Sequence, residues 1–198
     1  MTTKTLNISE EQLVDYSKAH NEPSWMTELR KKALKLTETL EMSKPDKTKL
    51  RKWDFDTFKQ HHTTGDSYHQ LTDLPKSVKE IIDVENSENL IIQHNNDLAY
   101  TQVSDQAKND GVIIEGLSEA LVNHSDLVQK YFMTKAVNVD EHRLTALHTA
   151  LVNGGIFVYV PKNTVVEHPI QYVVLHDDEQ ASFYNHVIIV TEESAEVT

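Results

Sequence analysis

The sequence changes its hydrophobic period once, at Gly154-Gly155, and this change constrains the fold more than any other feature. Before it, several segments repeat apolar residues at intervals of three and four, the spacing of one helix face. After it, no helical period occurs, and short strand-like runs alternate with turn residues. These runs cover residues 155–160, 164–167, 170–175, 186–190 and 195–198. The sequence therefore predicts an α+β protein with a mainly helical domain over 1–145 and a β-rich domain from 146 to 198.

Strands at such short intervals are typical of a sandwich, a barrel or a β-solenoid. A solenoid coil cannot bury its own apolar face and needs stacked neighbours. The strand-like pattern still runs at residue 198, so we expect these residues to be the front of a longer protein. On this interpretation the last strands leave an uncovered edge beside Ile188, Ile189, Val190 and Val197.

Two helices are predicted near the N-terminus. Ser9 and Gln12 form a capping-box pattern, and the helix that follows should end near Ala19. A second helix begins within residues 21–24. Its predicted buried stripe consists of Trp25, Leu29, Ala33, Leu36 and Leu40. The basic residues Arg30, Lys31, Lys32 and Lys35 lie off this stripe and are predicted to form the solvated face.

The middle of the chain mixes irregular segments with short elements. Residues 43–73 are polar and read as irregular, with at most a helical turn in 48–55. Asp73 is predicted to cap a short helix that has Pro75 in its first turn. Two β-rich runs, 89–94 and 97–103, flank Asn95-Asn96 and predict a small β-hairpin.

The second half of the predicted helical domain contains one more strand and further helices. Residues 112–114 favour a strand, and 118–132 favour one or two helical segments. Asp140 is the predicted start of the last helix, and Gly154-Gly155 are predicted to end it, because glycine readily adopts the positive φ of a helix C-cap.

The charge balance excludes several classes of partner. Lys and Arg number 19 and Asp and Glu 31, a formal net charge of −12. An acidic chain is not expected to bind nucleic acid or an anionic membrane, since both require a basic surface. The one basic stretch, residues 30–52, has nine basic side chains against three acidic ones. It is predicted to be a solvated surface or a contact for an acidic partner.

The eleven histidines raise the question of a metal site. The densest group is His61, His62, Asp66 and His69, but its spacing matches neither a zinc finger nor an HExxH helix. A second group, His168, His176 and His186, would need a common strand face. His148 is interpreted as a hydrogen-bonded structural side chain on the last helix. No metal site is predicted from either group.

Catalytic signatures are missing from the sequence. Cysteine is absent, which excludes disulfides, thiol nucleophiles and thiolate-held iron within these residues. No GxSxG, GxxxxGK[ST] or GxGxxG motif occurs. The acidic runs 177–179 and 192–193 are interpreted as solvated turns. We therefore predict no catalytic, cofactor-binding or metal-binding residue, and no enzyme activity.

No targeting or membrane segment is predicted. Residues 1–10 lack the apolar stretch of a signal peptide, and the longest apolar runs, 156–160 and 187–190, are far shorter than a bilayer span. The expectation is a soluble cytoplasmic protein.

The stretch 148–171 resembles the SufB/SufD family of iron–sulfur cluster assembly scaffolds. In that family a helix leads into an NGG strand, a VPK turn and a second strand that opens with a proline. The matching positions are Asn153, Gly154, Gly155, Phe157, Val160, Pro161, Lys162, Glu167, Pro169 and Ile170. A weaker similarity to the N-terminal domain of SufD-type members rests on Glu22, Pro23, Ser24, Trp25, Met26, Leu29, Arg30, Ala33, Leu34 and the segment 49–55.

The resemblance implies that residues 146–198 open a right-handed parallel β-helix. It also implies a non-catalytic scaffold subunit, most like SufD, that pairs with a SufB-like subunit and an ABC-type ATPase, SufC. Contacts with SufC are expected mainly in the later part of the family's sequence. No functional residue of the family maps onto a position here. The alternative is a β-solenoid polysaccharide-active enzyme with a helical front domain.

Overall fold

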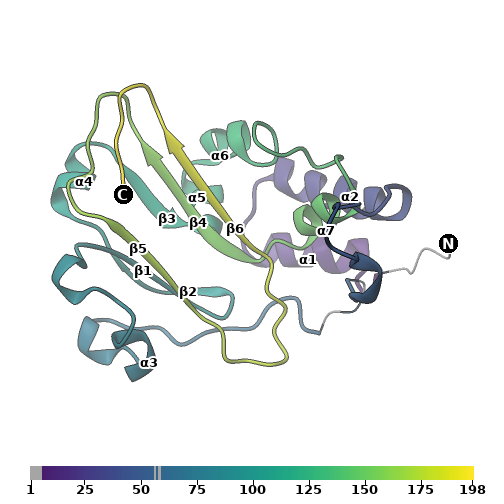
Figure 1. Cartoon of the computed structure of the whole chain (residues 1–198), viewed down its shortest axis with the longest axis horizontal. Helices are drawn as coiled ribbons and strands as arrows, with labels where there is room; N and C mark the ends of the chain where they lie inside the picture. Colours follow the sequence, from purple (N-terminus) through teal and green to yellow (C-terminus); the bar gives the residue numbers. More distant parts are fainter. Residues whose placement is uncertain (1–5, 56, 58) are drawn as a thin grey trace. The chain divides into compact units, whose positions relative to one another are not determined.

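The computed structural model describes residues 6–55, 57 and 59–198. The part of residues 1–10 that precedes Leu6, and the side chain of Arg51 in the basic stretch, lie outside this description. The chain forms two compact units that are interleaved in sequence (Figure 1). The helical unit combines the residues up to His61 with Ala120–Val152, and the strand unit combines His62–Glu119 with Asn153–Thr198.

The helical unit contains α1 (Glu10–Ala19), α2 (Ser24–Thr39), α6 (Ser125–Tyr131) and α7 (Arg143–Leu151), while α5 (Leu117–Asn123) crosses the boundary between the units. The predicted capping box is confirmed. The Gln12 N–H donates to Ser9 Oγ at 3.2 Å, and the Ser9 N–H donates to Gln12 Oε1 at 2.8 Å. In the described part of residues 43–73, the helical turn η1 (Leu50–Lys52) lies within the predicted 48–55, and η2 (Leu71–Asp73) is a further turn that was not predicted.

The buried face of α2 differs from the prediction. Its buried residues are Met26, Arg30, Ala33 and Thr37, so the prediction that Arg30 belongs to the solvated face is wrong. Arg30 is only 1% exposed. Its guanidinium forms a bidentate pair with the Glu22 carboxylate, at 2.5 and 2.8 Å, and Nη1 donates to the Ala150 carbonyl at 3.0 Å. These partners satisfy the buried cation, so a basic residue occupies a core position.

The predicted start of the last helix at Asp140 and the predicted cap Asp73 are also wrong. The last helix, α7, begins at Arg143, and its cap is His142, whose Nδ1 accepts the Thr145 N–H at 3.2 Å. Asp73 does not cap α3 (Lys76–Lys79), because its carboxylate accepts bonds from Gln70 and His69 instead. Residue type alone does not identify a helix cap, because the side-chain oxygen of an Asp can satisfy neighbours on either side of it.

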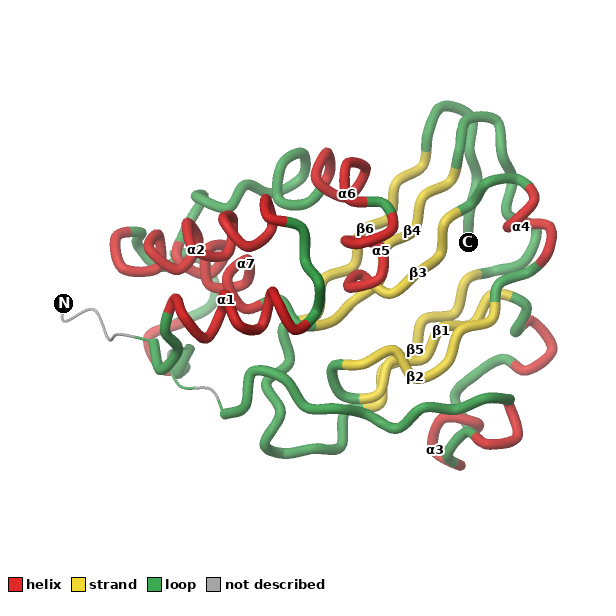
Figure 2. Tube along the Cα trace, turned by 180° about the vertical axis from the view of Figure 1, so that it is seen from behind, coloured by secondary structure: helices red, strands yellow, loops and turns green. Residues whose placement is uncertain are grey.

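The strand unit contains two three-stranded sheets (Figure 2). One sheet has the order β2 (Asp97–Gln102), β1 (Asn89–His94), β5 (Ile170–Leu175), and the other β3 (Ile113–Gly116), β4 (Gly154–Val160), β6 (Asn185–Thr191). The predicted hairpin is confirmed, since β1 and β2 pair antiparallel across Asn95-Asn96. The short helix α4 (Asp105–Asn109) precedes β3.

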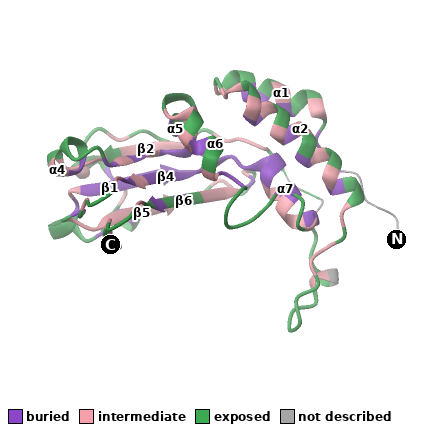
Figure 3. Cartoon of the chain, turned by 90° about the horizontal axis from the view of Figure 1, so that it is seen from above, coloured by how far each residue is buried: buried purple, intermediate pink, exposed green. Residues whose placement is uncertain are grey.

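Each sheet mixes parallel and antiparallel pairs. β1 pairs in parallel with β5, and β4 in parallel with β6, whereas β2 and β3 add antiparallel edges. Burial is concentrated on the middle strands β1 and β4 (Figure 3). One apolar cluster takes residues from both sheets, including Ile91, Ile114 and Val158, so the inner faces share a core. A second cluster packs Leu90 and Ile92 against Leu74 and Val78.

The α+β class is confirmed, but two of the predicted strands are not formed. Residues 164–167 and 195–198 contribute a single parallel bridge, between Val165 and Glu196. The predicted uncovered edge is confirmed for β6, which is an outer strand of its sheet, although Ile188 and Val190 are only 8% and 9% exposed. The exposed side chains of β6 are Val187 and Ile189, at 46% and 59%.

None of the helices in the described residues is long and apolar enough to cross a bilayer.

Candidate functional site

The histidines of the first candidate metal group contact different partners. His61 Nε2 is 2.9 Å from the Leu151 carbonyl oxygen, and His62 Nε2 is 2.9 Å from Asp97 Oδ1. Asp66 belongs to a separate contact with His94, described below. Within the residues that the structure describes, no group of three or more His, Cys, Asp or Glu side chains could hold a metal ion.

The second histidine group does not share a strand face. His168 Nδ1 lies 3.6 Å from Glu88 Oε2, and the His176 ring packs on Phe183 with centroids 5.1 Å apart. The His186 backbone packs against Gly155, where its carbonyl oxygen would lie 1.9 Å from an added Cβ. His148 is half-buried, and burial followed by the charge of Arg30 lowers its pKa, which favours the neutral ring.

The most concentrated polar site of the strand unit is the end of the β1–β2 hairpin. Gln93, Asn95 and Asn96 are all buried there. Asn95 Oδ1 accepts the N–H groups of Asp177 and Asp178, each at 3.2 Å. Asn96 Nδ2 donates to the Ser182 carbonyl at 3.1 Å. The hairpin end therefore fixes the loop between β5 and β6, because buried amide side chains replace the backbone partners that this loop lacks.

Asn153 and the two glycines after it complete this network. Asn153 Nδ2 donates to the Ser182 carbonyl at 2.8 Å, and its Oδ1 accepts the Tyr184 N–H at 2.9 Å. The Gly155 N–H donates to Gln93 Oε1 at 2.9 Å. Gly155 has φ +131°, and an added Cβ on Gly154 would lie 2.4 Å from Gln93 Nε2.

The prediction that Gly154-Gly155 end a helix is therefore wrong. α7 ends at Leu151 with Val152 as its C-cap, and the glycines begin β4. They are required by the close approach of Gln93 and of the β6 backbone.

A strap of chain, residues 62–68, crosses the hairpin end. The Thr63 N–H donates to Asn96 Oδ1 at 2.8 Å, and the Gly65 N–H donates to Asp97 Oδ2 at 3.2 Å. The Tyr68 N–H donates to the Ala99 carbonyl at 2.8 Å. An added Cβ on Gly65 would lie 2.0 Å from the His94 carbonyl oxygen. Glycine is thus the residue that lets the strap lie directly on β1.

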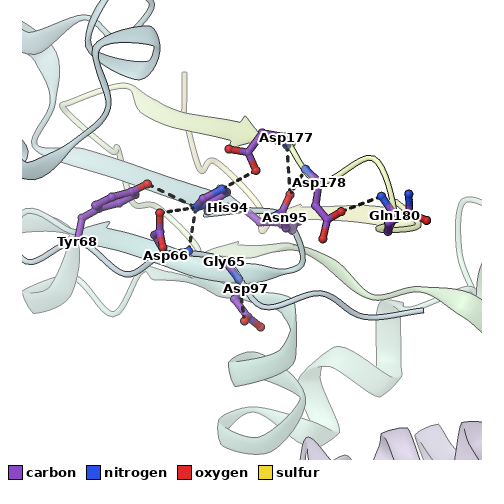
Figure 4. Close-up of polar contacts among 10 residues, drawn as sticks. Gly65, Asp66, Tyr68, His94, Asn95, Asp97, Asp177, Asp178 and Gln180 are labelled. Carbon is purple, nitrogen blue, oxygen red and sulfur yellow. Dashed lines mark hydrogen bonds and ion pairs between the residues drawn. The ribbon is translucent and has the colours of Figure 1, made fainter. Parts of the chain in front are cut away.

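His94 joins the strap to the β5–β6 loop (Figure 4). The side chain is 7% exposed, and Nδ1 accepts the Asp66 N–H at 2.8 Å. Nε2 lies 2.9 Å from Asp177 Oδ1. A nitrogen that accepts an N–H bond has no proton, so the ring has its proton on Nε2 and donates it to Asp177.

The ionisable groups around His94 have shifted pKa values. The hydrogen bond from His94 lowers the pKa of the Asp177 carboxyl, and burial opposes this only partly. The Tyr68 hydroxyl lies 3.4 Å from Nδ1, and burial together with the charges of Asp66 and Asp177 raises its pKa. Burial also raises the pKa of Tyr172 to about 12, and its hydroxyl lies 2.5 Å from Gln93 Oε1. Both phenols are therefore neutral at pH 7.

The chemistry of this site is that of a structural junction. His94 and Asp177 resemble the base and orienting carboxylate of a catalytic triad, but the ring nitrogen that would activate a nucleophile accepts a backbone N–H instead. Asp177 is 58% exposed, as its interpretation as a solvated turn residue predicts, but it also pairs with His94. The run Asn95-Asn96 between two strands was the only local signal for this site.

Comparison with known protein families identifies the class. The chain matches the family model described as "SufBD protein N-terminal region" over residues 10–172. This range contains the helical unit's elements, the hairpin and the NGG motif. The chain belongs to the SufBD family and represents the N-terminal region of its members.

Individual members of the family show which proteins the chain is similar to. The chain is 45% identical, over 98% of its own length, to the protein named "Iron-sulfur cluster assembly protein SufD" of Bacillus subtilis. It is 28% identical, over 96% of its length, to an iron–sulfur cluster assembly SufBD family protein of Pyrococcus horikoshii. The matched part is 44% of each of these relatives, so the chain spans less than half the length of the curated relatives that it matches.

Proposed function

We propose that this chain is the front part of a SufD-like scaffold subunit of the SUF iron–sulfur cluster assembly system, and that it has no catalytic activity of its own. The observation that supports this most directly is the 45% identity to the Bacillus subtilis SufD over 98% of the chain. In the strand unit, the polar contacts of His94 join chain segments to one another, as expected of a structural junction.

We further propose that β4, β5 and β6 open a parallel β-helix. β4 and β6 pair in parallel through seven consecutive positions, while β5, which lies between them in sequence, belongs to the other sheet. The backbone of residues 163–170 pairs likewise with that of 193–198. The chain passes from β4 in one sheet to β5 in the other sheet and back to β6, which lies beside β4. This is the path of a solenoid coil.

The side chains of β6 support this proposal. Val187 and Ile189 are in register with Ile156 and Val158, which belong to the core shared by both sheets. Neighbouring positions of paired strands point to the same face, so Val187 and Ile189 point inward. In this proposal, Val187 and Ile189 are 46% and 59% exposed because a strand of a following coil would cover them.

The N-terminal elements have a defined role in this proposal. β1 and β3 cover the free edges of β5 and β4, so the hairpin region caps the start of the β-helix. We propose an N-terminal domain over 1–145 and a core domain from 146. Strands β1 and β3 of the first domain pair with β5 and β4 of the second.

The proposed partners are a SufB-like and a SufC-like subunit, with SufC contacts mainly in the part of the protein after residue 198. No nucleic acid, membrane or resident cofactor is proposed, and the proposed location is the cytoplasm.

Co-purification tests this function. The full-length protein, tagged and expressed with SufB-like and SufC-like subunits, should form a complex, and residues 1–198 alone should not retain SufC. Retention of SufC by residues 1–198 at equal affinity would contradict the placement of the contact. Glycan cleavage by the purified full-length protein, with no complex formed, would favour the polysaccharide-active alternative.

A further inference from the structure

We propose that His94 is a pH-sensitive latch, whose neutral ring holds the strap 62–68 onto the β1–β2 hairpin and whose protonation releases Asp66 from it. The proposal concerns local opening within the strand unit and is independent of the scaffold function. It rests on the two different hydrogen bonds of one ring, on its burial, and on the two carboxylates beside it.

The neutral ring fits both of its neighbours. Nδ1 accepts the Asp66 N–H at 2.8 Å, and Nε2 donates to Asp177 Oδ1 at 2.9 Å. Because the side chain is 7% exposed, water has little access to replace either bond. One ring therefore connects two loops that are more than 100 residues apart in sequence.

The protonated ring fits Asp177 but not the Asp66 N–H. A proton on Nδ1 would point at the Asp66 N–H, so two donors would face each other and that hydrogen bond would be lost. The Nε2 contact with Asp177 would instead become an ion pair. Protonation thus breaks the attachment to the strap and strengthens the attachment to the β5–β6 loop.

Titratable groups lie on both sides of the ring. From the strap, Asp66 Oδ2 lies 3.8 Å from Nδ1, and the Tyr68 hydroxyl lies 3.4 Å from it. From the β5–β6 loop, Asp177 contacts Nε2. From the hairpin itself, Asp97 pairs with His62 of the strap. After release, Asp66 or Tyr68 can accept the new Nδ1–H, provided that the backbone of residue 66 turns away.

The opening is confined to one part of the strap. Thr63 and Gly65 are bonded to Asn96 and Asp97, and these bonds do not involve His94. Protonation of His62 would strengthen its contact with Asp97. Acid is therefore expected to free residue 66 while residues 62–65 stay in place.

Amide hydrogen exchange combined with a ring titration by NMR tests the latch in the intact wild-type chain. At pH 7.5 the Asp66 amide should be protected, and at pH 5 its protection, corrected for the intrinsic exchange rate, should fall about fivefold, the loss of one hydrogen bond. The midpoint of this loss should coincide with the titration of the His94 ring. The Thr63 amide should keep its protection.

Two matched variants sharpen the test. His94→Gln replaces the ring with a side chain that does not titrate in this range, so the pH dependence of Asp66 protection should disappear. His176→Gln makes the same replacement at an exposed histidine and should leave the dependence unchanged.

The proposal is overturned if Asp66 protection does not change with pH, if it changes without following the His94 titration, or if Thr63 is released together with Asp66. The wild-type measurements decide the question even if His94→Gln fails to fold.

Discussion

The helical unit and the strand unit each bury one ionisable side chain against a carboxylate, and the two pairs behave differently. In the helical unit, Arg30 and Glu22 are 1% and 2% exposed, and the guanidinium is charged at every physiological pH. In the strand unit, His94 is 7% exposed but its partner Asp177 is 58% exposed, and an imidazole, unlike a guanidinium, also exists in a neutral form. The first pair is a fixed part of a core, and the second is an adjustable contact between loops.

The difference follows from how each pair is completed. Arg30 uses three of its nitrogens, two on Glu22 and one on the Ala150 carbonyl, and Ser17 Oγ donates to Glu22 at 2.7 Å. Burial raises the pKa of Glu22, but the charge and hydrogen bonds of Arg30 outweigh burial, and the net pKa is lowered. A pair closed off from water in this way has no low-cost alternative partner.

Removing the charge of Glu22 should have the largest effect. Glu22→Gln leaves Arg30 as an uncompensated buried cation, and we expect a loss of about 3–5 kcal/mol in the free energy of unfolding of the helical unit. Urea denaturation followed by Trp25 fluorescence, in a Trp53→Phe background that leaves one tryptophan, measures it. Glu28→Gln, which breaks only an exposed contact with Lys31, should cost less than about 1 kcal/mol. Equal costs for the two variants would contradict the comparison.

The second largest loss of stability is expected when the strap is forced away from the hairpin. Gly65→Ala places a Cβ 2.0 Å from the His94 carbonyl oxygen, so the strap must move and lose its bonds to Asn96 and Asp97. We expect the strand unit to lose about 2–3 kcal/mol, the net value of two or three hydrogen bonds. Hydrogen exchange of the β1 amides measures this, and the fluorescence transition of Trp25 should not shift.

The inward position of Ile189 can be tested by comparing two chain lengths. Ile189→Ala should cost less than about 0.5 kcal/mol in residues 1–198, where the side chain is 59% exposed. In the full-length protein, where a following coil would cover it, the cost should rise to about 2–4 kcal/mol. Ile188→Ala, at an 8% exposed neighbour, should cost a similar amount in both lengths. A small cost for Ile189→Ala in the full-length protein would exclude the proposed coil.

The smallest expected effect is the contribution of Asp177 to acid stability. Its folded-state pKa is lowered, so the stability that it contributes is present above its unfolded pKa of about 3.9 and is lost as the pH falls through the folded value. Because the carboxylate is more than half exposed, Asp177→Asn should flatten the acid side of the stability curve of the strand unit by less than about 1 kcal/mol.

The pKa of Glu22 is also lowered, and Glu22 is buried. Glu22→Gln should therefore flatten the acid side of the stability curve of the helical unit by more than Asp177→Asn flattens that of the strand unit. A larger flattening from Asp177→Asn would reverse the proposed order of the two pairs. Asp178→Asn, which removes the next carboxylate in the same loop, is the matched control.

Several elements could be predicted from local sequence because their hydrogen bonds are local. The Ser9–Gln12 capping box and the Asn95-Asn96 hairpin depend on residues within a few positions of one another, and both were predicted correctly. The NGG motif was recognised in the sequence, but the contact that requires glycine within it was not predicted. Gly155 is required by the close approach of the His186 backbone, which is 31 residues away, and no local pattern contains that information.

By itself, the sequence determined the α+β class, the change of period at Gly154-Gly155 and the membership of the SufBD family. Tertiary structure decided that Arg30 faces the core, that β1 pairs with β5, and that His94 meets Asp177. Hydrophobic period records the average environment of a residue, and it places a cation on the solvated face by default. Whether a polar side chain is instead buried depends on partners brought from distant positions, because only a complete set of hydrogen bonds offsets the cost of removing it from water.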